Sequence, residues 1–472
     1  MTTANPYRGK RATVMGLGTR AGGAGVARFL ARAGASVTVT DLRPAAELRD
    51  ALATLDGLPV TLRLGGHDPA DFGPEGADLV VRNPAVRRRA PLLEAARASG
   101  VPVEMEMSIF FRLCPAPVVG VTGTKGKTTV ATLIGDLLRA WDPTTVLAGN
   151  MGISALEQLE RTGPATPVVI ELSSWQLEGL AEHRMAPRVA VLTNISEDHL
   201  NTYDGFADYA ATKRSIAAHQ SAADWLVVNR DDPEAWRASG ETKARVVPFG
   251  LRDPGGDGAW LAGDELVWRA AGAEERYPRP AGDALAGDHN AANALAALAA
   301  ARLRGAPPAA VRRGLAGYRG VPDRMERVAT VGGVAFVNDT TATAPVAAAA
   351  ALAALGAVPG RTVHLLCGGA SKGLDPSSLV AAAARVRPRP YLLDGTATAD
   401  LGERLRAAGV EPAGVYASMD AALAAAASAA VPGDVVILSP GCASFGIFRD
   451  EFDRGEQFRR WALARAAEES AR

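Results

Sequence analysis

The residues with the most evident chemical potential lie in one short stretch, residues 120–129, which reads GVTGTKGKTT. An apolar run precedes the glycines and an amphipathic run follows them, which predicts a strand, a glycine-rich turn and a helix start. Backbone N–H groups of such a turn point into one cavity, and the helix N-terminus adds partial positive charge, so the arrangement suits phosphate. Lys127 would reach the outer phosphates of a nucleotide, and the Thr128 hydroxyl would bind Mg²⁺. Val121 stands where the standard pattern begins with glycine, so the stretch is a variant P-loop; a glycine-rich turn with a chance lysine is the alternative.

Two further residues that can bind metal follow predicted strands of the same segment. Glu171 ends one apolar run, and His199 follows another at residues 189–192. Parallel strands present such ends on one edge of the sheet, so both side chains are expected to converge on a metal near Thr128. A histidine is an unusual ligand for Mg²⁺, which indicates a second metal or a histidine that partly serves the substrate. The alternatives are an acid at a helix start for Glu171 and a capping or core histidine for His199.

A second glycine-rich turn lies near the N-terminus, between an apolar run at residues 11–17 and a helical pattern at residues 26–33. The next β-branched run ends at Asp41, about 20 residues on, which is the dinucleotide-type fingerprint. It predicts a nucleotide diphosphate on the turn that contains Gly18, with Asp41 near the ligand. A third strand leads to a turn at Asn83, expected at the same edge of the sheet and against the same nucleotide. A plain βαβ unit with glycines for packing is the alternative.

Length and repeated strand–helix patterns predict the architecture. At about 150 residues per domain, 472 residues suggest three domains. We expect an α/β fold with a Rossmann-like domain at residues 1–115, a central P-loop ATPase-type parallel-sheet domain at 116–320 and a Rossmann-like domain at 321–472. The glycine-rich residues 314–322 are the expected hinge.

The amino-acid composition limits the kinds of molecule that the protein is expected to bind. Lys plus Arg and Asp plus Glu are both 51, so the net charge of zero argues against a general nucleic-acid or membrane-surface binder. The three widely spaced cysteines, and the lack of a signal core or long apolar stretch, suit a protein of the reducing cytoplasm. We expect a monomer.

Four residues have local patterns that leave their roles open. Lys213, in a predicted helix, reads as one surface lysine among many. Asn290 and Asn293 share a helix face, where they would read an adenine edge or cap the helix, and capping is the favoured interpretation. Cys442 is expected to be a small buried residue rather than a nucleophile.

Taken together, these stretches resemble the Mur ligase family, the ATP-dependent amino-acid-adding enzymes of peptidoglycan precursor synthesis. The motifs that carry the resemblance occur in family order: GTKGKTT at 123–129, GNMG at 149–152, ELSSWQLE at 171–178, NISEDHL at 194–200, HNAAN at 289–293, ND at 338–339 and SPGCAS at 439–444. The resemblance implies an enzyme that adds D-glutamate to UDP-N-acetylmuramoyl-L-alanine through an acyl phosphate. A ligase that adds L-glutamate to the same precursor, a folylpolyglutamate-synthetase-like ligase and a regulatory P-loop protein are the alternatives.

The resemblance also implies roles for single residues. It implies that ATP binds to two groups of residues. The first is the P-loop, namely Gly123, Thr124, Lys125, Gly126, Lys127, Thr128 and Thr129, and the second is Asn290, Asn293, Arg324 and Asp339. It implies two Mg²⁺ ions, held by Thr128, Glu171, His199 and a carbamylated Lys213; Lys127, His199 and Lys213 are the expected catalytic residues. The UDP-sugar is expected at Gly18, Asp41, Asn83, Asn150, Ser173 and His199, and the incoming glutamate at Thr343, Lys372 and Ser444.

The chain departs from the family pattern at three positions in the last segment. Asp323 precedes Arg324 where the family has a His-Arg pair. Thr341 stands where D-glutamate-adding members usually have lysine, and Gly446 replaces an acid. These departures cluster where the amino acid would bind, so they leave the enantiomer of glutamate open.

Overall fold

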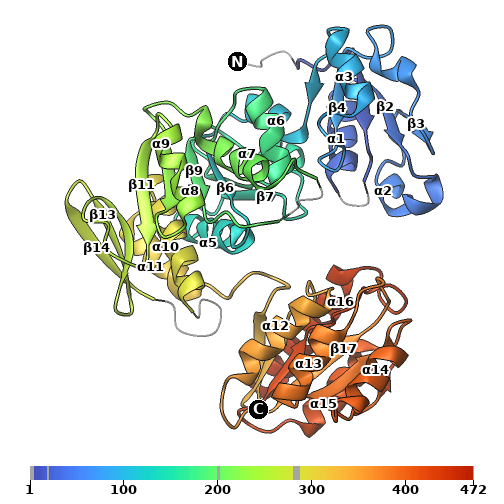
Figure 1. Cartoon of the computed structure of the whole chain (residues 1–472), viewed down its shortest axis with the longest axis vertical. Helices are drawn as coiled ribbons and strands as arrows, with labels where there is room; N and C mark the ends of the chain where they lie inside the picture. The colour runs from blue at the N-terminus through green and yellow to red at the C-terminus, as the bar shows by residue number, and fades with distance from the viewer. Residues whose placement is uncertain (1–4, 19–20, 199–201, 280–286, 471–472) are drawn as a thin grey trace. The chain divides into compact units, whose positions relative to one another are not determined.

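Three α/β domains, each with its own mainly parallel sheet, follow one another along the chain (Figure 1). The computed structural model describes residues 5–18, 21–198, 202–279 and 287–470. The chain divides into two compact units, residues 1–318 with the first two sheets and residues 319–472 with the third. The three-domain α/β expectation is therefore confirmed, while the exact boundaries stay a prediction.

The first domain is an open parallel sheet with the strand order β3-β2-β1-β4-β5. The order reverses at β1, so the crevice between the ends of β1 and β4 is where such a sheet binds a ligand. Both turns singled out in the sequence follow these two strands. The elements are β1 (Arg11–Met15), α1 (Ala21–Arg32), β2 (Ser36–Asp41), α2 (Arg49–Ala53), β3 (Val60–Leu64), β4 (Leu79–Arg82), α3 (Pro91–Ala98), β5 (Val103–Glu104) and α4 (Glu106–Leu113).

The central domain has a nine-stranded sheet of order β14-β13-β12-β11-β10-β9-β6-β8-β7. Its first seven strands along the chain, β6 to β12, are parallel, and β13 and β14 extend the sheet from β12 by antiparallel pairing. The strands are β6 (Val118–Thr122), β7 (Val146–Gly149), β8 (Val168–Glu171), β9 (Val189–Leu192), β10 (Trp225–Asn229), β11 (Arg245–Gly250), β12 (Gly258–Ala262), β13 (Glu265–Ala270) and β14 (Ala273–Pro278). The helices are α5 (Lys127–Arg139), α6 (Ser174–Glu182), α7 (Phe206–Ala218), α8 (Pro233–Trp236), α9 (Ala238–Glu241), α10 (Asp288–Leu303) and α11 (Pro308–Gly317).

The core of the central domain explains its alanine content. β6 is buried along its whole length between β8 and β9. Helix α10 packs against both α5 and the sheet, and the alanines at 294, 296, 297 and 299–301 are fully buried. Small side chains let the helix approach on all faces at once, which places its N-terminal asparagines close to the P-loop.

The third domain has the strand order β15-β16-β20-β17-β18-β19, parallel except for the β15–β16 hairpin. Its elements are β15 (Glu326–Val331), β16 (Val334–Asn338), α12 (Pro345–Gly356), β17 (Val363–Gly368), α13 (Ser377–Val386), β18 (Arg389–Leu393), α14 (Thr398–Ala407), β19 (Val415–Tyr416), α15 (Met419–Ala429), β20 (Val435–Leu438) and α16 (Glu451–Ser470).

The structure corrects two expectations about local elements. The helix after the first glycine turn starts at Ala21, although the sequence pattern suggested residue 26. The expected hinge at 314–322 is helical in its first part, because α11 continues to Gly317. Gly314 packs against α5, where an added Cβ would lie 2.8 Å from Leu137 Cα, so this glycine serves close packing.

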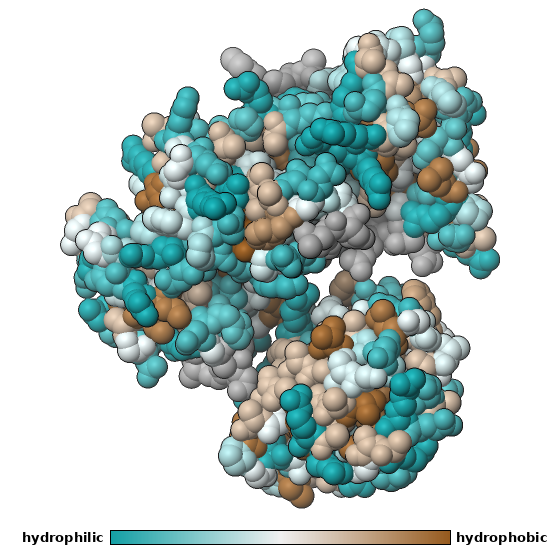
Figure 2. Space-filling view, viewed as in Figure 1, coloured by the Kyte–Doolittle hydropathy of each residue, from teal (hydrophilic) through white to brown (hydrophobic). Residues whose placement is uncertain are grey.

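Large apolar side chains such as Leu42, Val346 and Phe445 are exposed at positions far apart in the sequence. On the face shown in Figure 2, hydrophobic residues are scattered in small groups among hydrophilic ones. None of the helices in the described ranges is both long and apolar enough to span a bilayer.

Candidate active site

The predicted P-loop has the expected geometry. Strand β6 enters the turn, Gly126 adopts a left-handed φ of +81°, and α5 starts at Lys127. No side chain caps the start of α5, so its first N–H groups point into the turn, as in phosphate sites. Lys127 Nζ donates to the carbonyls of Gly123 and Thr124, each at 2.9 Å, so the ammonium group lies over the turn.

The end of β9 braces this turn. Thr193 Oγ1 donates to the Lys125 carbonyl at 2.7 Å, and Asn194 Oδ1 accepts from Lys125 N at 2.9 Å. Thr124 N donates to the Asn194 carbonyl at 2.8 Å. A Cβ at Gly123 would overlap Thr193 Oγ1, so glycine is needed for this close approach. The loop is therefore held in shape before any ligand binds.

Glu171 ends β8 beside the P-loop strand and is 1% exposed. Its Oε1 accepts from Asn150 Nδ2 at 2.9 Å, whereas its Oε2 is buried with no hydrogen-bond partner among the described residues. A buried carboxylate oxygen without a partner is costly unless a cation or donor completes it. The residue therefore fits a Mg²⁺ ligand, and α6 starts only at Ser174, so Glu171 is not the acid of a helix start.

Lys213 is only 2% exposed, so the surface-lysine interpretation is wrong. It lies on α7, with its Nζ 5.0 Å from the centre of the Tyr209 ring, and the Tyr209 hydroxyl lies 3.2 Å from Thr124 Oγ1 of the P-loop. Burial, together with the nearby positive charge of Lys127, lowers the pKa of Lys213 to about 7. A substantial fraction of the amine is thus neutral, and therefore nucleophilic, near neutral pH.

The paired asparagines lie against the P-loop. Helix α10 begins at Asp288 after Gly287, so Asn293 lies beyond its first turn and does not cap it, while capping by Asn290 stays a prediction. Asn293 is 8% exposed and donates through Nδ2 to Asn290 Oδ1 at 3.2 Å. A Cβ at Gly126 would lie 2.5 Å from Asn293 Oδ1, which places this amide directly beside the phosphate turn.

In the first domain, Asp41 lies beside the glycine turn but is already engaged. Its Oδ2 accepts from the N–H groups of Leu17 and Gly18 at 2.9 and 3.3 Å, and Arg43 binds both of its oxygens. Burial opposes ionisation of Asp41, but these hydrogen bonds outweigh it and hold its pKa below the usual value. Asn83 faces the same turn, because a Cβ at Gly16 would lie 3.0 Å from Asn83 Cβ.

Ser173 has a structural role that its motif did not reveal. Its Oγ accepts from Gln176 N at 3.2 Å, and Gln176 Oε1 accepts from Ser173 N at 2.9 Å, which is a capping box at the start of α6. His199 lies outside the described residues.

The third domain gathers its predicted residues on loops at the strand ends. Lys372 Nζ donates to Thr343 Oγ1 at 2.8 Å, which joins two of the predicted glutamate positions. Ser444 is 3% exposed on a loop tied to the Lys372 loop by the backbone pair Ala370–Ala443.

Asp339 follows β16 and is 4% exposed. It accepts from Ser439 Oγ at 2.7 Å and from Met325 N at 3.1 Å. Burial raises its pKa to about 6, against the opposing effect of these hydrogen bonds and of Arg324. Cys442 is buried as expected, and burial raises the pKa of its thiol, which suits a packing residue.

Comparison with known proteins decides the family. The descriptions "Mur ligase MurD-like, N-terminal domain", "Mur ligase middle domain" and "Mur ligase, glutamate ligase domain" match residues 10–104, 121–301 and 323–442. The chain belongs to the Mur ligase family. It is 47% identical over 463 residues to the UDP-N-acetylmuramoylalanine--D-glutamate ligase of Roseiflexus sp. (strain RS-1), across 96% of this chain and 98% of that protein.

Other Mur ligases are similar at greater distance. The protein of the same name from Symbiobacterium thermophilum is 39% identical over 456 residues, covering 95% of this chain and 97% of its own. The crystal structure of UDP-N-acetylmuramate-alanine ligase from Thermotoga maritima has a TM-score of 0.57 at 20% identity, over 96% of this chain and 99% of that one. The latter likeness shows a shared fold.

Several residues that shape the site were not anticipated. Thr193 and Tyr209 contact the P-loop, and Arg43 binds Asp41 beside the first glycine turn, although each belongs to another strand end or helix. The polar residues directly after β9 were a usable signal for Thr193. No local pattern marked Tyr209, since its contact with Thr124 spans 85 residues.

Proposed function

We propose that this chain is the ATP-dependent ligase that joins D-glutamate to UDP-N-acetylmuramoyl-L-alanine, with ADP and phosphate as the other products, in peptidoglycan precursor synthesis. The observation that carries the reaction type is the braced P-loop beside the Glu171 carboxylate, which has a buried oxygen without a partner. The similarity to a D-glutamate ligase over 96% of the chain supports the choice of substrates.

The first step is activation of the substrate carboxylate. A carboxylate is a poor acceptor for an amine, because its carbonyl is stabilised by resonance and hydroxide is a poor leaving group. Transfer of the γ-phosphoryl group from ATP gives an acyl phosphate with a good leaving group. Such transfer depends mainly on positioning and charge neutralisation, which suits Lys127 over the turn and the N–H groups at the start of α5.

The donor set beside the P-loop fits Mg²⁺. Among the described residues no group of three His, Cys, Asp or Glu side chains could hold a metal alone, so the substrate phosphates would complete the shell. Thr128, Glu171 and a carbamylated Lys213 would hold one ion, and His199 a second. When bound beside the P-loop, Mg²⁺ would neutralise negative charge on the phosphate oxygens.

The second step joins the amino acid. We place the incoming glutamate at Thr343, Lys372 and Ser444, where an ammonium group and two hydroxyls can bind its carboxylates. The amine attacks the acyl phosphate carbon, and phosphate leaves from the tetrahedral intermediate. Asn150 and the glycine turn at Gly18 would hold the UDP-sugar, and we propose a cytoplasmic monomer.

Phosphate release from ATP tests the proposal. The purified chain is assayed with UDP-N-acetylmuramoyl-L-alanine and either D-glutamate or L-glutamate, and separately with folate and L-glutamate. We expect release only with the UDP-sugar and D-glutamate. Lys127→Ala serves as the inactive control, with a loss of about 3 kcal/mol or more in transition-state stabilisation, or over about 100-fold in kcat. Intact ATP with every substrate combination would refute the proposal, and release with L-glutamate alone would reassign the amino acid.

A further inference from the structure

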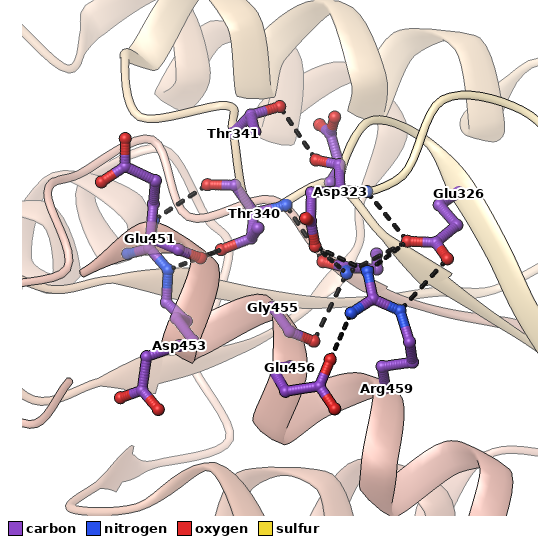
Figure 3. A network of polar contacts seen from close by, with 12 residues as sticks. Asp323, Glu326, Thr340, Thr341, Glu451, Asp453, Gly455, Glu456 and Arg459 are labelled. Carbon is purple, nitrogen blue, oxygen red and sulfur yellow. Dashed lines mark hydrogen bonds and ion pairs between the residues drawn. The ribbon is translucent and has the colours of Figure 1, made fainter. Parts of the chain in front are cut away.

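Arg459 on α16 joins two carboxylates at the start of the C-terminal unit (Figure 3). Its Nη2 donates to Asp323 Oδ1 and to Glu326 Oε2, each at 2.9 Å, and its Nε donates to Glu326 Oε1 at 3.3 Å. The side chains of Arg459, Asp323 and Glu326 are 23%, 14% and 16% exposed. The planar guanidinium can hold both acids in fixed directions, which a lysine cannot do.

This network holds the backbone on both sides of Arg324. Asp323 and Met325 have φ of +63° and +45°, a left-handed conformation that residues other than glycine rarely adopt. Asp323 N donates to Glu326 Oε2 at 2.8 Å, and Met325 N donates to Asp339 Oδ1 at 3.1 Å. The Asp323 carbonyl accepts from Thr341 N and Oγ1 at 3.2 and 2.9 Å. Surrounding contacts thus impose an otherwise unfavourable backbone.

Helix α16 is shaped to admit Asp323. A Cβ at Gly455 would overlap Asp323 Oδ1, so glycine at this position lets the carboxylate reach the helix. Asn338 Nδ2 donates to Asp323 Oδ1 at 2.8 Å and completes its shell. The Asp323 side chain is therefore packed within the C-terminal domain, at the position where the family pattern has histidine.

Arg324 itself remains exposed between these two held residues. We propose that Arg459 is a positioning residue for the nucleotide, which acts through Asp323 and Glu326 to present the Arg324 guanidinium to ATP in one fixed direction. The inference rests on the proposed function and on the role at ATP that the resemblance to the Mur ligase family implies for Arg324. Preorganisation of this kind lowers the ordering cost at binding, so its loss weakens ATP binding without any change in direct contacts.

A purely structural role for Arg459, as an anchor of α16, is the competing explanation. A double-mutant cycle separates the two, because residues that act through one another are not additive. The variants are Arg459→Gln, Arg324→Ala and the double variant, with the KM for ATP, the KM for UDP-N-acetylmuramoyl-L-alanine and kcat measured for each. Arg465→Gln, which removes an exposed ion pair with Glu468 on the same helix, is the matched control.

We expect Arg459→Gln to raise the KM for ATP about 10-fold and to leave the KM for the UDP-sugar unchanged. Arg459→Lys should recover part of the loss, and Arg465→Gln should match wild type. In the Arg324→Ala background, Arg459→Gln should change the KM for ATP less than about 2-fold. An equal effect in both backgrounds, or an unchanged KM for ATP in Arg459→Gln or in Arg324→Ala, overturns the inference.

The experiment also covers an Arg459→Gln variant that does not fold and a wild-type enzyme that is inactive. If Arg459→Gln does not fold, Asp323→Asn replaces it in the same cycle, because the amide keeps one oxygen for Asn338 and removes the negative charge that binds Arg459. Wild-type enzyme that releases no phosphate would refute the proposed function. Active wild type with an additive cycle would refute the positioning role alone.

Discussion

Lys213→Ala tests whether the buried lysine becomes a carbamate that helps to hold Mg²⁺. Carbamylation requires a neutral amine, whose nitrogen attacks the carbon of CO₂ as one C=O π bond opens. The nitrogen then loses a proton to solvent, which leaves a negatively charged carbamate. Lys213 lies near the positive charge of Lys127, which disfavours its ammonium form. The same positive charge would stabilise the carbamate, whereas the carboxylates of Asp198 and Glu171 oppose both changes, an effect that a bound Mg²⁺ would offset.

The magnitude follows from the pKa. At pH 7.5 an exposed lysine with a pKa of 10.5 is neutral about one part in a thousand, whereas a pKa of about 7 leaves about three quarters neutral. Burial therefore raises the reactive fraction of Lys213 by several hundred-fold. Removal of the side chain deletes a metal ligand, for which we expect kcat to fall about 100-fold or more.

The assay combines turnover with direct detection of the carbamate. We expect a carbamate carbon signal by NMR in wild type supplied with ¹³C-bicarbonate, and its absence in Lys213→Ala. Acetate or formate should restore part of the activity of Lys213→Ala, since either can place a carboxylate in the vacated space. Lys243→Ala, at an exposed lysine, is the control and should resemble wild type in every measurement. Full activity of Lys213→Ala, or a wild type without the carbon signal, would show that the reasoning is wrong.

Two other perturbations follow from the geometry. Gly126→Ala should lower the free energy of unfolding by about 1–2 kcal/mol, because φ at this position is +81°. It should also raise the KM for ATP about 10-fold, because the new Cβ would lie 2.5 Å from Asn293 Oδ1. Gly255→Ala, with φ of +79° in open space, is the control and should lower stability without changing the KM for ATP. His364 is buried against Asp434, and burial lowers its pKa below 6.5. Because the unfolded state then binds more protons, the free energy of unfolding, measured by urea denaturation, should fall as pH drops below about 6.5. In His364→Phe the free energy of unfolding should depend less on pH in this range. An unchanged pH dependence in that variant would show that His364 is not the group responsible.

The strand ends that carry the site were predictable because their signals are local. Glu171 ends a run of buried β-branched residues, and parallel strands must present such ends on one edge of the sheet. The P-loop was predictable for the same reason, since its glycines, its lysine and the flanking periodicity lie within 20 residues.

The environment of Lys213 was not predictable, because it depends on contacts between distant segments. Helix α7 shows ordinary helical spacing, and its packing against neighbouring elements, among them α6, α9 and β9, removes the amine from water. Asn293 is a similar case. Its sequence neighbourhood suits a helix cap, but the approach of α10 to α5 places the amide against Gly126, about 170 residues earlier in the chain.

The link between the two units shows how one residue type can mislead. A glycine-rich run suggests flexibility, yet Gly314 is glycine because α11 packs on Leu137, and Tyr318 is buried with the same core. On the other side, Asp323 is bound by Arg459 and Asn338 of the C-terminal unit. The contacts thus assign Tyr318 to the first unit and Asp323 to the second. Arg324 directly follows Asp323 in the second unit, and for this reason the effect of Arg459→Gln should appear in ATP binding.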